Sequence, residues 1–274
     1  MAEQVRRAAV LGRPIAHSLS PVLHRAAYAE LGLRWRYDAI ECGEDELASV
    51  LAERPDWAGF SCTMPLKRAV LDVADELSAP VRSVGAANTL LPRPGGGWLA
   101  DNTDVRGLCA VLAEHGVRPV SAVVLGSGGT AQAAVVALGL TGLTRCAALV
   151  RDVGRAGQLR AVADAAGVAL EVGVLSADAA ALSAELVVSA LPPRAADPVA
   201  ARPWRAGQAV LDVVYQPWPT ALATAVSAAG GAVLSGALLL LHQAAAQVEL
   251  MTHRAAPVEA MRTALRAAAP GCGV

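Results

Sequence analysis

At 274 residues, with 54% hydrophobic and 17% charged residues, the chain has ample material for a folded core and lacks the composition of a disordered protein. Its formal net charge of -1 and its aromatic content of 3% disfavour a nucleic-acid or anionic-membrane surface, so we expect neither as a partner. The length accommodates two domains of ordinary size.

The N-terminal sequence and the cysteines indicate a reducing compartment. The first apolar run ends at Gly12-Arg13-Pro14 and is too short for the core of a signal peptide, which predicts a cytoplasmic protein. Residues 121–144 carry no charge, but they contain a glycine turn, so a buried strand–turn–helix is expected there rather than a membrane span. The cysteines are widely spaced without a CxxC pair, which predicts reduced thiols and no metal site.

In the first part of the chain, short apolar runs alternate with helical patterns, which predicts an α/β domain with a mixed sheet. The expected strands are residues 8–12, 36–40 and 58–62, and the expected helices are residues 21–32, 44–53 and 65–74. Residues 87–91 and 97–100 flank a stretch rich in proline and glycine and are expected to form a hairpin.

A helix over residues 105–115 is expected to lead into a second domain. Beyond it, strands alternate with helices, which is typical of a doubly wound parallel sheet. Strands are expected at residues 122–125, 146–150, 169–172, 186–189, 209–213 and 232–234, with helices from Gly129 and up to about Ala166. The final helices, residues 236–252 and 257–268, are expected to return to the first domain. The predicted domains are therefore residues 1–104 with 238–274, and residues 105–237.

A glycine turn marks the start of the second domain. Gly126-x-Gly128-x-x-Ala131 follows an apolar run and opens a helix, so its backbone can approach a pyrophosphate at a helix N-terminus. Arg151 and Arg155 follow the next strand, where a 2′-phosphate would need cationic donors. Asp152 lies beside them and could instead bind a free ribose hydroxyl. The pattern predicts a dinucleotide site and favours NADP, with NAD as the alternative.

Lys67 and Asp104 are the candidate catalytic groups. Lys67 follows a Thr-x-Pro turn, and Asp104 ends an Asn-Thr-Asp triplet. Taken singly, each has an ordinary structural explanation, as a surface lysine and as a helix N-cap. Together, and near a dinucleotide site, they could move a proton while a cofactor moves a hydride. The pair therefore indicates a dehydrogenase acting on a small polyol or hydroxy acid.

The longer motifs resemble those of the shikimate dehydrogenase family, in the same order, from about residue 8 to residue 252. They are Gly12-Arg13-Pro14-Ile15-Ala16-His17-Ser18-Leu19-Ser20-Pro21-Val22-Leu23-His24, Thr63-Met64-Pro65-Leu66-Lys67, Gly85-Ala86-Ala87-Asn88-Thr89, Asp101-Asn102-Thr103-Asp104-Val105-Arg106-Gly107, Gly126-Ser127-Gly128-Gly129-Thr130-Ala131, Asp212-Val213-Val214-Tyr215-Gln216-Pro217 and Gly236-Ala237-Leu238-Leu239-Leu240-Leu241-His242-Gln243-Ala244.

The resemblance implies a substrate-binding α/β domain followed by an NADP-binding Rossmann domain, in a monomer or homodimer. It implies the reversible NADP-linked interconversion of 3-dehydroshikimate and shikimate, on the route to chorismate and the aromatic amino acids. Lys67 and Asp104 would be the catalytic pair. The substrate residues would be Ser18, Ser20, Thr63, Asn88 and Gln243, with Tyr215 nearby. The cofactor residues would be Gly126, Ser127, Gly128, Gly129, Thr130, Arg151, Arg155 and Gly236.

The chain also departs from the family pattern. Ser61-Cys62 replaces a usual Asn-Val pair, which we expect to be tolerated, and Leu239 replaces a usual Met. Val150-Arg151-Asp152 replaces a common Asn-Arg-Thr, which leaves cofactor preference open. Ser20 favours shikimate over quinate, because relatives that use quinate often carry threonine there. The alternatives are a quinate- or NAD-preferring enzyme and a non-catalytic sensor of shikimate or nucleotide. Whether Lys67 acts as an acid/base or as an electrostatic stabiliser is left open.

Overall fold

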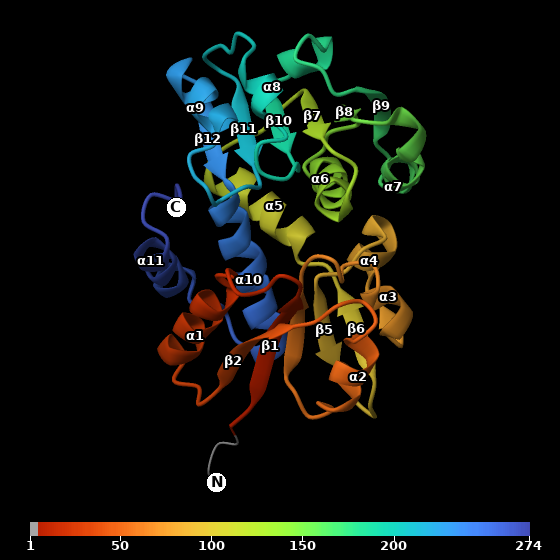
Figure 1. Cartoon of the computed structure of the whole chain (residues 1–274), viewed down its shortest axis with the longest axis vertical. Helices are drawn as coiled ribbons and strands as arrows, with labels where there is room; N and C mark the ends of the chain where they lie inside the picture. Colours follow the sequence, from red (N-terminus) through yellow and green to blue (C-terminus); the bar gives the residue numbers. More distant parts are fainter. Residues whose placement is uncertain (1–4) are drawn as a thin grey trace. The chain divides into compact units, whose positions relative to one another are not determined.

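The computed structural model describes residues 5–274. The chain forms two compact units, shown in Figure 1. The first comprises Met1–Gly107 and Leu240–Pro270, and the second comprises Leu108–Leu239 and Gly271–Val274. The chain leaves the first unit within helix α5 (Asp104–Glu114) and re-enters it within helix α10 (Gly236–Thr252).

The first unit is built on a six-stranded mixed sheet of order β2-β1-β3-β5-β6-β4. Its strands are β1 (Arg7–Gly12), β2 (Arg36–Glu41), β3 (Gly59–Cys62), β4 (Glu76–Leu77), β5 (Thr89–Pro92) and β6 (Trp98–Asp101). Its helices are α1 (Ser20–Glu30), α2 (Leu47–Ala52), α3 (Val70–Val73), α4 (Ala79–Val84), α11 (Val258–Ala268) and most of α10. Strands β1, β2 and β3 are parallel, whereas β5 runs antiparallel to β3 and β6, which confirms the predicted hairpin.

Both faces of this sheet are buried, and β1 shows why its sequence is apolar throughout. Ala9 and Leu11 pack in the core that includes residues of α2, α3 and α4. Ala8 and Val10 alternate with them and pack on the opposite face, with residues of α1 and α10. In Figure 1, α1 and α11 lie side by side although they come from opposite ends of the chain. A strand covered on both faces therefore reads as a continuous apolar run.

The second unit contains an all-parallel six-stranded sheet of order β12-β11-β10-β7-β8-β9. Its strands are β7 (Ala122–Leu125), β8 (Arg145–Val150), β9 (Ala169–Val174), β10 (Leu186–Ser189), β11 (Ala209–Asp212) and β12 (Ala232–Ser235). Its helical segments are α6 (Gly129–Leu140), η1 (Val153–Arg155), α7 (Gly157–Ala165), η2 (Ala180–Ser183), α8 (Asp197–Ala200) and α9 (Ala221–Ala228), together with the end of α5 and the start of α10. The strand order reverses between β7 and β10, as in a dinucleotide-binding sheet. The predicted α/β class is confirmed.

Several elements differ from the sequence expectation. The helix predicted over residues 65–74 is wrong in its first half, because residues 64–69 form turns and only Val70–Val73 is α-helical. One of these turns is closed by Leu66 N donating to Thr63 O at 2.8 Å, which lets the chain bend just before Lys67. The elements β4, α4, α8 and α9 were not predicted. No helix among residues 5–274 combines the length and apolarity needed to cross a bilayer.

Candidate active site

Several of the predicted substrate-binding and catalytic residues lie at one edge of the first sheet. Strands β1, β3 and β6 end at this edge, and β5 begins there, because β5 runs antiparallel to its neighbours. Accordingly Ser18 and Ser20 follow β1, Thr63 and Lys67 follow β3, Asn88 precedes β5 and Asp104 follows β6. Sheet topology thus brings together residues that are far apart in the sequence.

Lys67 and Asp104 form an ion pair, with Nζ of the lysine 2.5 Å from Oδ2 of the aspartate. The Asp104 side chain is 7% exposed, whereas that of Lys67 is 25% exposed. A buried carboxylate is costly unless it is paired and hydrogen-bonded, and here both conditions are met. The ammonium group is therefore held by a fixed anion while part of it remains accessible.

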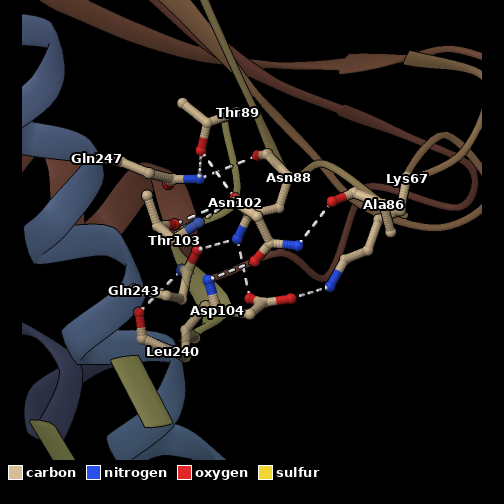
Figure 2. Close-up of polar contacts among 10 residues, drawn as sticks. All are labelled: Lys67, Ala86, Asn88, Thr89, Asn102, Thr103, Asp104, Leu240, Gln243 and Gln247. Carbon is tan, nitrogen blue, oxygen red and sulfur yellow. Dashed lines mark hydrogen bonds and ion pairs between the residues drawn. The ribbon is translucent and has the colours of Figure 1, made fainter. Parts of the chain in front are cut away.

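Asn88 holds the second carboxylate oxygen. Its Nδ2 donates to Asp104 Oδ1 at 2.8 Å, as Figure 2 shows. The orientation of the Asn88 amide follows from its neighbours, because the backbone N–H of Thr103 can only donate and lies 2.8 Å from Asn88 Oδ1. The hydroxyls of Thr103 and Thr89 also donate to this oxygen, at 3.1 and 2.8 Å. The amide nitrogen must consequently face the carboxylate.

The triplet that contains Asp104 is itself fixed by Asn102. The side-chain oxygen of Asn102 accepts from Asp104 N at 3.0 Å, and its Nδ2 donates to Ala86 O at 2.8 Å. Asn102 is 1% exposed and Thr103 is fully buried. These contacts fasten the segment that follows β6 to the segment that precedes β5, so the start of α5 presents its carboxylate in one position.

Gln243 reaches the same cluster from α10. Its Oε1 lies 3.4 Å from Asn88 Nδ2, and its Nε2 donates to Leu240 O at 2.9 Å (Figure 2). Ser18 and Ser20 are adjacent at the start of α1, where Ser18 Oγ accepts from Ser20 N at 3.3 Å. Thr63 is fastened to the end of β1 by its N–H, which donates to Leu11 O at 2.9 Å. The Gln243 amide therefore joins the cluster around Asn88, while Ser18, Ser20 and Thr63 lie in segments that follow strands at the same edge of the sheet.

In the second unit, the predicted glycine turn lies at the point where the strand order reverses. Gly126 has φ +109°, and a Cβ there would lie 3.2 Å from Ala190 O, in the segment that follows β10. Gly128 is the N-cap of α6 and makes no side-chain cap, so the N–H groups of Gly129 and Thr130 open the helix beside it. Ser127 O accepts from Gln132 Nε2 at 3.3 Å. An uncapped helix N-terminus next to a glycine is suited to bind phosphate.

Arg151 and Arg155 lie just past the end of β8. Neither guanidinium forms an ion pair with any of residues 5–274, and the Arg151 side chain is exposed. Asp152 does not pair with either arginine. Its Oδ1 accepts from Gly154 N at 2.9 Å and caps η1. This contact occupies one carboxylate oxygen within the turn and leaves both arginines without an acidic partner.

Gly236 and Tyr215 also lie in the second unit. Gly236 begins α10, and a Cβ there would overlap the backbone of Val213. Tyr215 belongs to the segment after β11, and partial burial raises the pKa of its phenol. Asp212 shapes this segment, because its carboxylate accepts from Val214 N at 3.3 Å and from Thr220 Oγ1 at 2.8 Å. Burial raises the pKa of Asp212.

No group of three or more His, Cys, Asp or Glu within the described residues is arranged to hold a metal ion. Thr103 and Gln247 were not predicted as site residues, although both contact Asn88. Gln247 lies four residues after Gln243 on α10, a spacing that places two side chains on one helix face. Two glutamines at that spacing in a mainly apolar helix were the available signal.

Comparison with known proteins finds family models that match an N-terminal and a C-terminal part of the chain. A family model described as the shikimate dehydrogenase substrate binding domain matches residues 10–90. A second, described as the shikimate 5′-dehydrogenase C-terminal domain, matches residues 237–266. The shikimate dehydrogenase (NADP(+)) of Symbiobacterium thermophilum is 35% identical, over 96% of this chain and 94% of that protein.

Solved structures agree over nearly the whole length. The crystal structure of Mycobacterium tuberculosis shikimate dehydrogenase is 47% identical with a TM-score of 0.85, covering 96% of this chain and 99% of that one. The shikimate 5-dehydrogenase of Thermus thermophilus, solved in complex with NADP(H) and shikimate, is 32% identical with a TM-score of 0.82, covering 96% and 100%. Given this agreement in sequence and in fold, the chain belongs to the shikimate dehydrogenase family.

Proposed function

We propose that the protein is an NADP-dependent shikimate dehydrogenase, which interconverts 3-dehydroshikimate and shikimate, and that Lys67 and Asp104 are its catalytic residues. The observation that carries the assignment of these residues is the 2.5 Å ion pair between a buried carboxylate and a partly exposed ammonium. Asn88 contacts the carboxylate of this pair, and the Gln243 amide contacts Asn88, which supplies amide groups of the kind that recognition of a polyol acid requires. Relatives with this name cover nearly the full chain.

The proposed mechanism assigns the proton to Lys67. In the direction of reduction, the carbonyl oxygen of 3-dehydroshikimate gains negative charge and needs a proton. The ammonium of Lys67 stabilises that charge and donates the proton to the oxygen, while Asp104 keeps the ammonium in place. In the reverse direction, the nitrogen of Lys67 takes the hydroxyl proton. Asn88 fixes the carboxylate, and the bound nicotinamide supplies or accepts the hydride.

The second unit fits NADP. The uncapped start of α6 and the open space beside Gly128 leave room for a pyrophosphate, which the N–H groups of Gly129 and Thr130 would bind. Gly126 and Ser127 form the turn before them. Arg151 and Arg155 would bind the 2′-phosphate, since they lie past the second strand of the Rossmann order and lack acidic partners. Gly236 belongs to the same unit and completes the proposed cofactor set.

The proposed substrate contacts are short polar groups. Ser18 and Ser20 would bind the carboxylate of shikimate, and Thr63, Asn88 and Gln243 would bind its hydroxyls. Tyr215 is proposed as an additional contact. Quinate carries a tertiary hydroxyl at the carboxylate-bearing carbon, which would need extra room beside Ser20. We therefore expect shikimate to be the preferred substrate.

The test is a matrix of steady-state assays that follow nicotinamide reduction. Shikimate and quinate are each combined with NADP and with NAD. The proposal expects the highest kcat/KM for shikimate with NADP. Preference for quinate or for NAD would identify the corresponding alternative enzyme. Absence of turnover in all four combinations, together with ligand binding in calorimetry, would support the non-catalytic sensor.

A further inference from the structure

Gln247 uses the full hydrogen-bonding capacity of its side-chain amide. Its Nε2 donates to Asn88 O at 3.1 Å and to Thr89 Oγ1 at 3.0 Å. Its Oε1 accepts from Ser61 Oγ at 2.7 Å and contacts His24 Nε2 at 3.2 Å. Gln247 is 1% exposed, so none of these bonds competes with bulk water. A single side chain of α10 thus joins α1, β3 and β5.

The orientation of this amide has only one solution. A backbone carbonyl oxygen can only accept, so the Gln247 atom facing Asn88 O must be the nitrogen. The oxygen then faces Ser61 and His24, and both must donate to it. His24 therefore carries a proton on Nε2, and burial, which lowers its pKa to about 3, keeps the ring neutral. Tyr37 OH donates to Ser61 Oγ at 2.5 Å and so directs the serine proton towards Gln247.

The donor side of Gln247 continues to the ion pair. Because Gln247 Nε2 occupies an acceptor site on Thr89 Oγ1, the hydroxyl proton of Thr89 points to Asn88 Oδ1 at 2.8 Å. Asn88 Nδ2 then donates to Asp104 Oδ1, and Lys67 Nζ donates to Asp104 Oδ2. Figure 2 shows this series from Gln247 to Lys67. Each hydrogen bond fixes the orientation of the next group, and the series ends at the ion pair of Asp104 and Lys67.

We propose that Gln247 is a positioning residue for the dehydrogenase reaction, acting through Thr89 and Asn88 on the carboxylate of Asp104. The inference rests on the proposed function. Gln247 touches neither Lys67 nor Asp104, and its effect arises from holding both the backbone and the side-chain orientation of Asn88. Ser61, at a position where the family usually carries asparagine, supplies the hydroxyl that matches the acceptor side of this glutamine.

The test compares loss of the whole Gln247 amide with one change on its donor side and one on its acceptor side. Gln247→Met removes both donors and the acceptor at similar volume, whereas Thr89→Val removes only the hydroxyl that links Gln247 to Asn88. Ser61→Ala lies in the same buried network but leaves both donors of Gln247 in place. Free energy of unfolding, kcat and KM are measured for each variant with shikimate and NADP. The double variant Gln247→Met/Thr89→Val completes a cycle.

We expect Gln247→Met and Thr89→Val each to lower kcat roughly 10-fold, less than a full misplacement of a catalytic group can cost. Their KM for NADP should not change. The kcat of the double variant should be no lower than that of the less active single variant. Ser61→Ala should lower kcat by less than about 3-fold, although it also removes a buried hydrogen bond.

Two results would overturn the inference. One is a Thr89→Val enzyme with kcat within 2-fold of wild type, a result that decides the matter even if Gln247→Met does not fold. The other is a Ser61→Ala enzyme that loses as much kcat as Thr89→Val, since this would make the network merely structural. Absence of wild-type turnover would instead refute the proposed function, and the inference with it.

Discussion

At the scale of single residues, the site depends on the buried carboxylate of Asp104. Asp104 is 5% exposed, yet both of its oxygens have partners and its backbone N–H is bound by Asn102. Removing one member of such a group leaves the others buried without compensation. Substitutions here should therefore change chemistry and stability together, and the two effects have to be measured separately.

Lys67→Ala should lower kcat by roughly 10²–10⁴, the scale of a positioned acid or base, with a smaller effect on KM for shikimate. Asp104→Asn should weaken both catalysis and the positioning of Lys67, because the neutral amide holds the ammonium less firmly. Steady-state kinetics with shikimate and NADP provide the measurement. Arg93→Ala is the matched control, because Arg93 is a cation at the hairpin turn, paired with Glu76. Near-normal kcat in Lys67→Ala would remove this lysine from the mechanism.

His24 should make stability depend on pH. Its ordinary pKa of 6.5 is lowered by burial to about 3 in the folded protein. Below pH 6.5 the unfolded chain therefore binds a proton that the folded chain does not, and stability is lost as pH falls. The loss approaches about 1.4 kcal/mol per pH unit. The aromatic rings that pack on His24 belong to Tyr28 and Tyr37, both neutral in this range.

Urea unfolding of wild type and of His24→Gln at pH 7, 6 and 5 isolates this contribution, since other titrating groups are common to both proteins. We expect the difference in free energy of unfolding to change with pH, with wild type losing stability faster as the solution is acidified. A difference that stays constant from pH 7 to pH 5 would show that His24 is not kept neutral by burial.

At the scale of elements, the helices and strands that were predicted correctly are those whose extent is marked by the local sequence. Helix α10 was predicted over residues 236–252, as observed, because Gly236 and the apolar pattern mark its extent. The parallel strands of the second sheet were predicted because each is a short, mainly apolar run, although β9 includes Glu171. Strand β4 has two residues and is defined by pairing with β6, and the helix predicted over 65–74 gives way to turns that place Lys67. The structure of these two segments depends on contacts with parts of the chain distant in sequence, which a local sequence pattern does not contain.

The predicted site residues and Gln247 also differ in how far local sequence indicates their role. Lys67 and Asn88 lie in the connections next to strand ends, and Asp104 begins α5 just after β6, where a polar residue in a motif already indicates chemistry. Gln247 lies in the middle of a buried helix, where its role depends on what β3 and β5 place opposite it. That information exists only in the assembled sheet.

The glycines of the cofactor segments differ in a way that can be tested. A Cβ at Gly128 would meet no atom within 4 Å, whereas one at Gly236 would overlap Val213. Gly128→Ala should therefore fold with a Tm close to that of wild type but show a raised KM for NADP, since the pyrophosphate needs that space. Gly236→Ala should lower Tm. A Gly128→Ala enzyme with unchanged KM for NADP would argue against this turn as the pyrophosphate site.

The segment after β8 should decide cofactor preference. Arg151→Ala should lower kcat/KM for NADP roughly 10-fold or more while leaving that for NAD nearly unchanged, because only NADP carries the 2′-phosphate. Arg145→Ala is the matched control, since Arg145 is an exposed arginine at the opposite end of the same strand. An Arg151→Ala change that leaves the preference for NADP intact would mean that another group reads the phosphate.

At the scale of the whole molecule, the proposed substrate-binding and cofactor-binding residues lie mainly in different units. The ion pair, Asn88 and Gln243 lie in the first unit, which is completed by residues 240–270 from the other end of the chain. The glycine turn and both arginines lie in the second. We propose on this basis that the first unit binds the substrate and the second binds NADP.

Hydrogen exchange at short labelling times should show this division directly. Shikimate should protect backbone amides in residues 61–69 and 86–104, where the chain turns around Lys67 and Asn88, because bound ligand suppresses local opening. NADP should protect residues 126–132 and 150–157, which contain the glycine turn and the segment after β8. Helix α9, which packs on β11 and β12, serves as the internal reference for each ligand. If shikimate protected residues 126–132 while leaving 61–69 unchanged, the assignment of substrate to the first unit would be wrong.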